Sequence, residues 1–369
     1  MRVLWISKAS VTASYRKKIA WLARLGVTVT VVTGNAWGPW QFESAPDDSF
    51  YRLIRLPQRL SNRNHFHWYS GLDPVVQSVK PDLIHVDEEH YSTVTYQAAH
   101  LAHRHNIPYI FQTWQNIYKH YPLPFSRMQA YVFQHAVAAL AGTPEIEAVV
   151  RRQGFKKPVF IVPLGVDSEI FFPNPRPEWR SEFHTQDRFA VGFIGRLVPE
   201  KGVLDLTDAL LPRLSHNRDW HWVIAGSGPL KASLSSRLAA YDAQVTWLPW
   251  LGTLDMAKLM NSLDVLVVPS KATARWKEQF GRVLIEAMAV KLPVVAYDSG
   301  AIAAVVGPAG VLVKEGDIRG LGEALLKISE SPDEARLLAQ LGLERIQSEF
   351  TQQRVASKIL SAYEAILSG

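Results

Sequence analysis

The sequence predicts two doubly wound α/β domains joined by a short linker. Short apolar runs alternate with longer segments of helical periodicity along the chain, a pattern typical of parallel sheets covered by helices. These runs are too many for one ordinary sheet, and 369 residues are enough for about two domains. Residues 163–180 hold four prolines and little periodicity, so we expect the domain boundary there, in a linker rather than in a helix or strand.

The apolar runs give the expected strands in order. In the first half, strands are expected at residues 2–7, 27–33, 82–86, 109–114 and 158–163, with a helix ending near Leu25 after the first of them. In the second half, they are expected at residues 189–195, 220–226, 245–251, 264–270, 293–298 and 310–314. The last stretch, 351–369, has helical apolar spacing. We therefore expect one domain over 1–168 and a second over 169–351.

Composition narrows the class of protein. Hydrophobic residues make up 47% and charged residues 20%, as in ordinary globular domains. No apolar run reaches the roughly 18–20 residues of a membrane span, and the N-terminus reads as a strand rather than a secretory signal. Cysteine is absent, which excludes disulfides and thiolate chemistry. The expected location is the cytoplasm.

The excess of positive over negative charge lies entirely in the first half. Residues 1–175 hold 18 Lys and Arg against 12 Asp and Glu, whereas the remainder holds 22 of each kind. Two interpretations stay open: a solvated basic surface, or a half that meets an anionic partner such as phospholipid head groups or a pyrophosphate-linked acceptor. No Lys/Arg-dense run or recognised motif indicates nucleic acid.

The stretch "YRKKIAWLARL" bears on whether this half has a solvated basic surface or meets an anionic partner. It combines Arg16, Lys17 and Lys18 with Trp and Leu at helical spacing. It is either the ordinary first helix of an α/β domain or a helix that lies on an anionic membrane surface.

"WKEQFGRVLIEAM" carries two glutamates eight positions apart, Glu278 and Glu286. Glycine is unfavourable inside a helix, so we expect a helix to begin just after Gly281. Glu278 would then lie on the preceding loop, and Glu286 about one turn inside the helix. Amides near Gly281, Arg282 and Val283 would then form an anion site at the helix start. This pattern suits a ligand with hydroxyls and a phosphate; the alternative is a surface loop with solvated glutamates.

Two further turns follow expected strands. In "GRLVPEKG", Arg196 and Lys201 flank a proline-bearing turn and could together bind a pyrophosphate, although such cations are often only solvated. In "VIAGSGPL", Gly226 and Gly228 would let the backbone approach a phosphate, or simply form a tight turn. Lys231 stands where a dinucleotide fingerprint needs a third glycine, which argues against a dehydrogenase.

No metal pattern appears in the sequence. The nearest is "HVDEEHYS", which contains His85 and Glu88 and follows an expected strand. A polar loop that faces substrate is the favoured interpretation there, with a metal site as the alternative.

Taken together, these segments resemble the family 4 retaining glycosyltransferases, which have the GT-B fold. "GFIGRLVPEKG", "VIAGSGP", "DVLVVPS", "EQFGRVLIEAMA" and "PVVAYDSGA" occur in that order, and the two glutamates match the family's Glu-x7-Glu motif. The resemblance implies two Rossmann-like domains that face a central cleft. It implies an acceptor on the first domain, a nucleotide sugar on the second, and a last helix, about 352–369, that crosses back to the first domain.

The resemblance also implies residue roles. The catalytic set would be Glu278, Arg196 and Lys201, with the two cations on the donor diphosphate and Glu278 beside the transferred sugar. Glu286 would bind the ribose hydroxyls, and the backbone near Leu251 would meet the base. The remaining donor contacts would come from Gly195, Gly226, Gly228, Phe280, Gly281, Arg282 and Val283. Acceptor contacts are expected from Lys8, His85, Glu88, Gln115 and Asn116.

The chain departs from the family pattern in three places. "SKASVTASYRKK" lacks the Gly-Gly loop that many relatives have after the first strand. "FQTWQNIYKHYP" offers Gln115 and Asn116 where many relatives place a histidine, so these polar groups replace it or the loop is shifted. Lys291 stands where relatives usually turn with glycine.

The expected function is a metal-independent, retaining glycosyltransferase that needs no cofactor beyond a nucleotide-diphosphate-sugar co-substrate. The expected acceptor is a saccharide or lipid-linked saccharide in surface polysaccharide synthesis, met in the cytoplasm or at the inner face of the membrane. Two alternatives stay open: another GT-B enzyme, either a sugar-nucleotide epimerase or a phosphorylase, and a non-catalytic two-lobed protein that binds nucleotide sugars.

Overall fold

The computed structural model describes residues 1–60, 63 and 65–368, and it divides the chain into two compact units. Unit 1 comprises Met1–Gly165 and Gln352–Gly369, and unit 2 comprises Val166–Thr351. The boundary lies three residues before the expected position at 168. Each unit is a parallel sheet covered by helices, so the predicted class of two Rossmann-like domains is confirmed.

Unit 1 is built on a seven-stranded sheet whose strands all run parallel. The strands are β1 (Arg2–Ile6), β2 (Thr28–Thr33), β5 (Arg52–Arg55), β8 (Leu83–Val86), β9 (Tyr109–Thr113), β10 (Ala138–Ala141) and β11 (Val159–Ile161). Their order across the sheet is β11-β10-β9-β8-β1-β2-β5. The helices are α1 (Ala13–Arg24), α2 (Leu72–Val79), α3 (Thr93–Arg104), α4 (Phe125–His135), α5 (Pro144–Arg152) and α14 (Gln352–Leu367).

Short elements complete unit 1. Two antiparallel ribbons pair β3 (Ala36–Trp37) with β4 (Trp40–Gln41), and β6 (Gln58–Arg59) with β7 (Trp68–Tyr69). Single 3₁₀ turns are η1 (Ala9–Val11) and η2 (Pro46–Phe50).

Two strands of the unit 1 sheet were not expected from the sequence. Strand β10 reads Ala-Ala-Leu-Ala and is fully buried, so it lacks the β-branched residues that mark a strand. Strand β5 reads Arg-Leu-Ile-Arg and lies at the sheet edge, where pairing with β2 defines it. In both cases the neighbouring strands, rather than local composition, determine the conformation.

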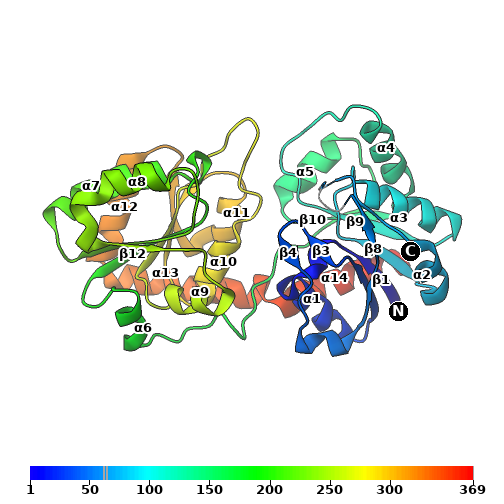
Figure 1. Ribbon diagram of the computed structural model, residues 1–369, viewed down its shortest axis with the longest axis horizontal. Helices are drawn as coiled ribbons and strands as arrows, with labels where there is room; N and C mark the ends of the chain where they lie inside the picture. Colours follow the sequence, from blue (N-terminus) through cyan, green and yellow to red (C-terminus); the bar gives the residue numbers. More distant parts are fainter. Residues whose placement is uncertain (61–62, 64, 369) are drawn as a thin grey trace. The chain divides into compact units, whose positions relative to one another are not determined.

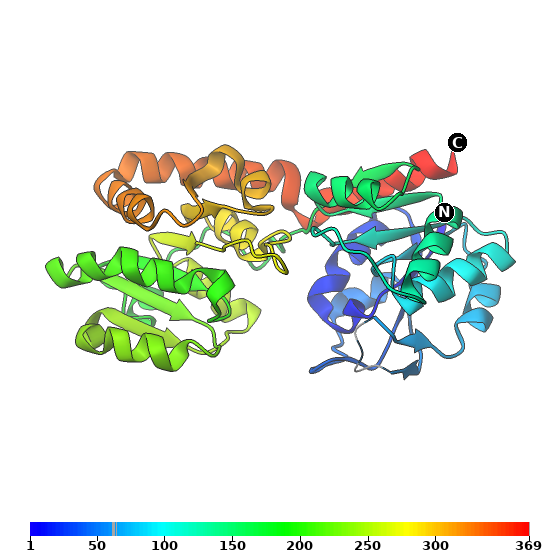
Figure 2. The ribbon, with the colours of Figure 1, turned by 90° about the horizontal axis from the view of Figure 1, so that it is seen from above.

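The last helix completes the core of unit 1. Val355, Ile359 and Tyr363 of α14 are fully buried and pack in one cluster with Ile19 of α1 and Trp5 of β1. Figure 1 shows α14, in red, running beside α1, in dark blue, although these helices lie near opposite ends of the chain. In both views the start of β1 and the end of α14 lie at the same end of unit 1 (Figure 2).

Unit 2 has a six-stranded parallel sheet in the order β14-β13-β12-β15-β16-β17. The strands are β12 (Phe189–Ile194), β13 (Trp220–Ala225), β14 (Val245–Leu248), β15 (Val265–Val268), β16 (Val294–Asp298) and β17 (Gly310–Lys314). The helices are α6 (Pro177–Glu182), α7 (Val203–His216), α8 (Lys231–Leu238), α9 (Thr253–Met260), α10 (Arg282–Ala289), α11 (Ile302–Val306), α12 (Ile318–Glu330) and α13 (Pro332–Arg345). Shorter turns are η3 (Pro199–Lys201), η4 (Ala239–Gln244), η5 (Gly307–Ala309) and η6 (Ile346–Phe350).

Alternation along the strands of unit 2 separates the two faces of its sheet. Val191 and Phe193 of β12 pack into the same cluster as Leu206 of α7 and Leu325 of α12. Gly192 points the other way, where an added Cβ would lie 2.3 Å from Leu263. The expected linker is mostly irregular, but helix α6 begins within it at Pro177, which occupies the first helical turn, a position that tolerates proline.

Candidate functional site

Polar residues gather where the strands of the unit 2 sheet end. In a parallel sheet the loops that follow the strands lie at one edge, the edge at which such folds bind ligands. The loops after β12, β15 and β16 are joined there by main-chain hydrogen bonds. The Lys271 amide donates to the Glu200 carbonyl at 2.8 Å, and the Ala301 amide donates to the Glu278 carbonyl at 3.1 Å. These bonds fix the backbone on which the predicted donor residues stand.

Lys201 and Glu278 form the centre of this edge. The Lys201 ammonium donates to Glu278 Oε2 at 2.5 Å, and the Ser270 hydroxyl donates to the same oxygen at 3.2 Å. Lys201 also lies over the Trp276 ring, 4.8 Å from its centroid. Both charged side chains keep some exposure, 21% for Lys201 and 12% for Glu278. The pair is therefore within reach of a ligand.

Sequence reasoning did not identify Ser270 or Trp276. Ser270 had a usable signal, because it ends the run "DVLVVPS" at the carboxyl edge of a strand. Nothing in the sequence distinguishes Trp276 from the other tryptophans.

Arg196 stands apart from that pair. Its side chain is 60% exposed and lies 3.7 Å from Glu200 in the same turn. Each cation of the turn thus has a different carboxylate partner, so the structure does not bring Arg196 and Lys201 onto one group. The exposed guanidinium is accessible to an anion.

Gly226 and Gly228 are required by the backbone next to them. An added Cβ at Gly226 would lie 1.9 Å from the Gly195 carbonyl oxygen, and one at Gly228 would lie 2.4 Å from that of Leu197. Both glycines also have positive φ, 144° and 158°. They let the loop after β13 pack against the loop after β12, so this contact accounts for them without a phosphate.

Helix α10 begins at Arg282, as predicted, directly after Gly281 with its φ of +81°. Glu278 is on the loop before it, and Glu286 is one turn inside. Glu286 receives a hydrogen bond from Arg282 at 3.3 Å, and its side chain is 15% exposed. Burial raises the pKa of Glu286, and Arg282 opposes that shift. The two glutamates have different partners and different surroundings.

Three other residues that are predicted to bind the nucleotide sugar differ in burial and surroundings. Phe280 is 3% exposed and its ring meets Phe350 edge to face at 5.8 Å, so only its main chain could contact a ligand. Val283 is half-buried in the first turn of α10. Leu251 is half-buried in the loop between β14 and α9, next to Trp250, which is 67% exposed.

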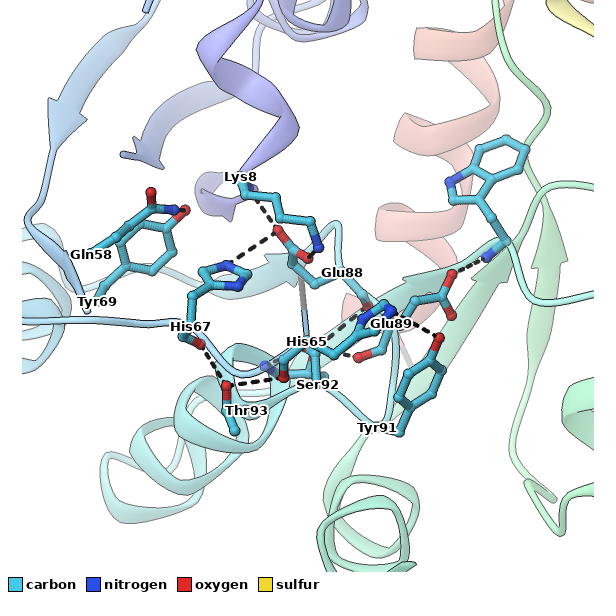
Figure 3. A network of polar contacts seen from close by, with 12 residues as sticks. Lys8, Gln58, His65, His67, Tyr69, Glu88, Glu89, Tyr91, Ser92 and Thr93 are labelled. Carbon is cyan, nitrogen blue, oxygen red and sulfur yellow. Dashed lines mark hydrogen bonds and ion pairs between the residues drawn. The ribbon is translucent and has the colours of Figure 1, made fainter. Parts of the chain in front are cut away.

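Unit 1 carries a second polar cluster at the carboxyl edge of its own sheet (Figure 3). Lys8, after β1, donates to Glu88, after β8, through both its amide, at 2.7 Å, and its ammonium. His67 approaches the same carboxylate at 3.9 Å. The Lys8 and Glu88 side chains are only 10% and 1% exposed. Burial raises the pKa of Glu88, and Lys8 opposes the shift.

Neighbouring residues of unit 1 hold the loop after β9. Glu89 accepts hydrogen bonds from the Thr113 hydroxyl at 2.7 Å and the Trp114 amide at 2.9 Å. Gln115 donates to the Ile117 carbonyl at 2.8 Å and accepts from the Tyr121 hydroxyl at 2.5 Å. Gln115 and Asn116 are 6% and 5% exposed. The amide of Gln115 therefore shapes the loop that contains it.

The prediction that His85 contacts an acceptor is corrected by the structure. Strand β8 continues to Val86, so His85 lies inside the strand rather than on the loop after it. Its side chain is fully buried, 3.8 Å from the Trp5 ring, and its Nδ1 lies 2.6 Å from the Tyr363 hydroxyl of α14. Burial lowers the pKa of His85 to about 3. It is a neutral core histidine.

The cations of α1 do not form a membrane-facing surface. Arg16 is 1% exposed and bonds Asp48, Tyr51 and the main chain of the preceding turn. Lys18 is 7% exposed and pairs with Asp87 at 3.1 Å, and Lys17 pairs with Asp47 at 2.9 Å. Of the two interpretations of this stretch, the structure supports the ordinary first helix.

Among the described residues, none of the helices is both long and apolar enough to cross a bilayer. Within the same residues, no group of three or more His, Asp or Glu side chains has the arrangement of a metal site.

Comparison with known families finds two matches along the chain. Residues 11–165 match the family described as "Glycosyl transferase 4-like domain", and residues 188–331 match "Glycosyl transferases group 1". Similar curated proteins include the capsular polysaccharide biosynthesis glycosyltransferase CapM of Staphylococcus aureus, 26% identical over 55% of this chain and 53% of that protein. The putative teichuronic acid biosynthesis glycosyltransferase TuaC of Bacillus subtilis is 22% identical over 99% of both chains. The chain spans about half the length of the first relatives that it matches.

Solved structures share the fold over the whole chain. Sucrose-phosphate synthase of Thermosynechococcus elongatus superposes with a TM-score of 0.74 and 19% identity, over 100% of this chain and 99% of that one. HepE of Anabaena, solved in complex with UDP, superposes with a TM-score of 0.73 and 17% identity, over 99% of this chain and 100% of that one. At these identities the likeness concerns the fold alone.

Proposed function

This chain belongs to the GT-B glycosyltransferases, and we propose that it transfers a sugar from a nucleotide-diphosphate-sugar to an acceptor with retention of the anomeric configuration and without a metal ion. The observation that supports this most is the carboxyl edge of the unit 2 sheet. There Lys201, the exposed Arg196 and Glu278 lie on loops bonded to one another, and helix α10, which carries Glu286, begins directly after the loop of Glu278.

In this proposal the donor lies along that edge. Arg196 and Lys201 neutralise the diphosphate as the bond between the sugar C1 and the β-phosphate oxygen breaks. The acceptor oxygen bonds to C1 on the same face, and its proton passes to the departing phosphate. Glu278 lies beside the sugar and Glu286 holds the ribose hydroxyls.

The Lys201–Glu278 pair gives this proposal a specific feature. Without donor, Glu278 occupies the lysine that the diphosphate needs. The β-phosphate therefore competes with Glu278 for Lys201, and the displaced carboxylate would then face the sugar. In the transition state, charge develops on the sugar and on the phosphate at the same time. Glu278 and Lys201 would therefore both act on atoms whose charge changes.

The acceptor in this proposal is a saccharide or lipid-linked saccharide of a surface polysaccharide, met at an anionic membrane. The names of CapM and TuaC place those proteins in capsular polysaccharide and teichuronic acid synthesis. On this chain, the positively charged unit 1 supports the same class. Lys8 and the loop of Gln115 and Asn116 are the proposed acceptor contacts, with Glu88 and Glu89 holding them in position.

A binding screen across UDP-, GDP- and ADP-sugars by calorimetry tests the proposal. We expect one nucleotide class to bind and Lys201→Ala to weaken it by about tenfold or more, because a charge-assisted contact is lost. The screen is followed by transfer assays with lipid extracts. Tight donor binding without transfer to any extract would favour a non-catalytic binding protein, and phosphate-dependent cleavage would favour a phosphorylase.

Metal independence has its own measurement. Since two cations are proposed to neutralise the leaving diphosphate, EDTA should leave the transfer rate nearly unchanged. A loss of more than about tenfold that Mg²⁺ or Mn²⁺ restores would contradict the proposal.

A further inference from the structure

Unit 1 has an apolar pocket that the donor chemistry does not use. Its volume is about 670 Å³, and it lies among β7, α2, α3 and α4. Its walls include Leu72, Pro74, Leu101 and Met128. Trp68, another lining residue, stays 39% exposed, and Tyr96 stays 36% exposed. A pocket of this size with apolar walls can hold a ligand of drug-like size or an alkyl chain.

Two polar side chains on the pocket wall, Gln97 and Thr93, are hydrogen-bonded to the chain segment that includes β7. Gln97 accepts from the Tyr69 amide at 3.0 Å and donates to the Tyr69 carbonyl at 2.7 Å. The Thr93 hydroxyl donates to the His67 carbonyl at 2.6 Å. These bonds fasten β7 to α3, so the pocket is preformed. They also leave a lining suited to hydrocarbon rather than to a peptide, whose main chain needs partners.

The pocket shares a wall with the polar cluster of unit 1. His67, just before β7, faces Glu88 at 3.9 Å, while its neighbour Trp68, the first residue of β7, lines the pocket. The chain segment His67–Tyr69 thus separates a charged cluster that includes Lys8 from an apolar cavity. A molecule with an anionic head and a hydrocarbon tail has this same division.

The charge at the pocket is balanced or positive. Asp73, the one carboxylate among the lining residues, is 2.6 Å from His105 and 3.2 Å from Arg104. The His105 hydrogen bond lowers the pKa of Asp73. Arg104 is 62% exposed, and Arg127, next to Met128, is also exposed. An anionic head group near the pocket would therefore meet cations.

We propose that this pocket binds the hydrocarbon chain of the lipid-linked acceptor. The inference rests on the proposed function, because it assumes that the acceptor carries a lipid. The exposed aromatic rings of Trp68 and Tyr96 fit the same ligand, since such rings favour the boundary between water and lipid. The chain buries apolar surface in unit 1 while the saccharide extends toward the loops that carry Lys8 and Asn116.

Binding of inorganic phosphate, butyl, octyl and dodecyl phosphate, measured by calorimetry below micelle-forming concentrations, tests the proposal. Each added methylene should tighten binding roughly fourfold until the pocket is full. Met128→Trp fills the pocket and should weaken dodecyl phosphate by about tenfold or more, and Tyr96→Ser should weaken it severalfold. Leu337→Trp, on an exposed position of α13 in unit 2, is the matched control and should change nothing.

Nucleotide-sugar binding is measured on the same variants. The affinity for the nucleotide sugar should be the same in the parent protein and in all these variants. A failure of the donor proposal and a failure of the pocket proposal are then separate results. Three outcomes would overturn the pocket proposal. One is affinity independent of chain length, and another is equal dodecyl phosphate binding in all folded variants. The third is a concentration-dependent dimer that Met128→Trp dissociates without any alkyl binding, which would make this face a contact between copies.

Discussion

Both sheets carry a lysine–glutamate pair at the same topological place, and the two pairs differ in burial. Lys8 follows β1 and Glu88 follows the adjacent strand β8, whereas Lys201 follows β12 and Glu278 follows the adjacent strand β15. In unit 1 the side chains are 10% and 1% exposed, and in unit 2 they are 21% and 12% exposed. The same geometry thus supplies a nearly sealed pair in unit 1, in which only Lys8 keeps some exposure, and a more open pair in unit 2.

The largest expected difference concerns folding stability. Lys8→Met leaves the Glu88 carboxylate buried without its cation and should lower the free energy of unfolding by about 3–5 kcal/mol. Lys201→Met removes a more exposed pair and should cost about 1 kcal/mol or less. Urea unfolding of both variants measures this.

A double variant serves as the control for the buried pair. Lys8→Met with Glu88→Leu replaces the pair by apolar groups and should recover most of the lost stability. If Lys201→Met destabilised the protein as much as Lys8→Met, the distinction between a sealed and an open pair would be wrong.

The next effect separates the two glutamates of unit 2. Glu278→Gln should lower kcat by about 10²-fold if its charge lies, as we propose, beside the sugar, where charge changes in the transition state. Glu286→Gln should chiefly raise KM if Glu286 holds the ribose as we propose, since those contacts would be the same in the ground and transition states. Steady-state kinetics with the donor found in the screen, and donor affinity by calorimetry, distinguish them.

Two further variants complete this comparison. Glu323→Gln, on exposed α12, should behave as the parent protein. Free nucleoside diphosphate should bind Glu278→Gln more tightly, because Lys201 loses its competing carboxylate. The same kinetic pattern for both glutamates would refute this division of labour.

The sequence predicted unit 2 better than unit 1. In unit 2 the apolar runs match the strands, and Gly281 correctly located the start of α10, because a positive φ there admits few residues other than glycine. Backbone requirements of this kind leave a signature in the sequence. The partner of Lys201 left no such signature, since it depends on which loops meet.

In unit 1, long-range packing buries side chains that the sequence alone did not predict to be buried. His85 is followed by a polar run, which favoured a loop, yet it is covered by Tyr363 from 278 positions further along the chain. Arg16 likewise reads as a surface cation, but η2 supplies Asp48 to bury it. No local pattern reports such a partner.

The pH dependence of stability should also differ between the units. Burial lowers the pKa of His85 and His90 in unit 1 to about 3. It lowers the pKa of His65 in unit 1 and of His221 in unit 2 to about 4. The unfolded chain titrates near the ordinary value of about 6.5, so it binds more protons below that pH. The contribution is present above pH 6.5 and is lost as the pH falls toward the folded values.

Three such histidines in unit 1 against one in unit 2 predict a difference of about 4 kcal/mol between pH 7 and pH 5. Hydrogen exchange of β8 and β9 should therefore lose more protection than that of β12 and β13, after correction for intrinsic rates. His90→Phe, in a site bordered by Phe111 and Phe133, should remove part of the loss. Equal losses in both sheets would contradict the assignment.

The smallest effect concerns a strained lysine in each unit. Lys80 ends α2 with φ of +46°, and Lys291 follows α10 with φ of +61°, in the left-handed region that glycine favours. Lys80→Gly and Lys291→Gly should each stabilise the protein by about 1 kcal/mol. Thermal unfolding measures both, with Lys314→Gly in strand β17 expected to destabilise instead. A loss of stability at Lys291 would show that its side chain is needed there.

The place of α14 in the core of unit 1 has a consequence for biosynthesis. Unit 2 is one uninterrupted segment whose ends meet, since Val166 donates from its amide to the Phe350 carbonyl at 2.7 Å and bridges to Thr351. Unit 1 begins first on the ribosome but cannot close its core until Ile359 and Tyr363 emerge with the last residues. Unit 2 is therefore complete while unit 1 still exposes the apolar face that α14 will cover. A nascent chain stalled after Thr351 and before α14 carries a finished unit 2 and an unfinished unit 1, the part that a chaperone would engage.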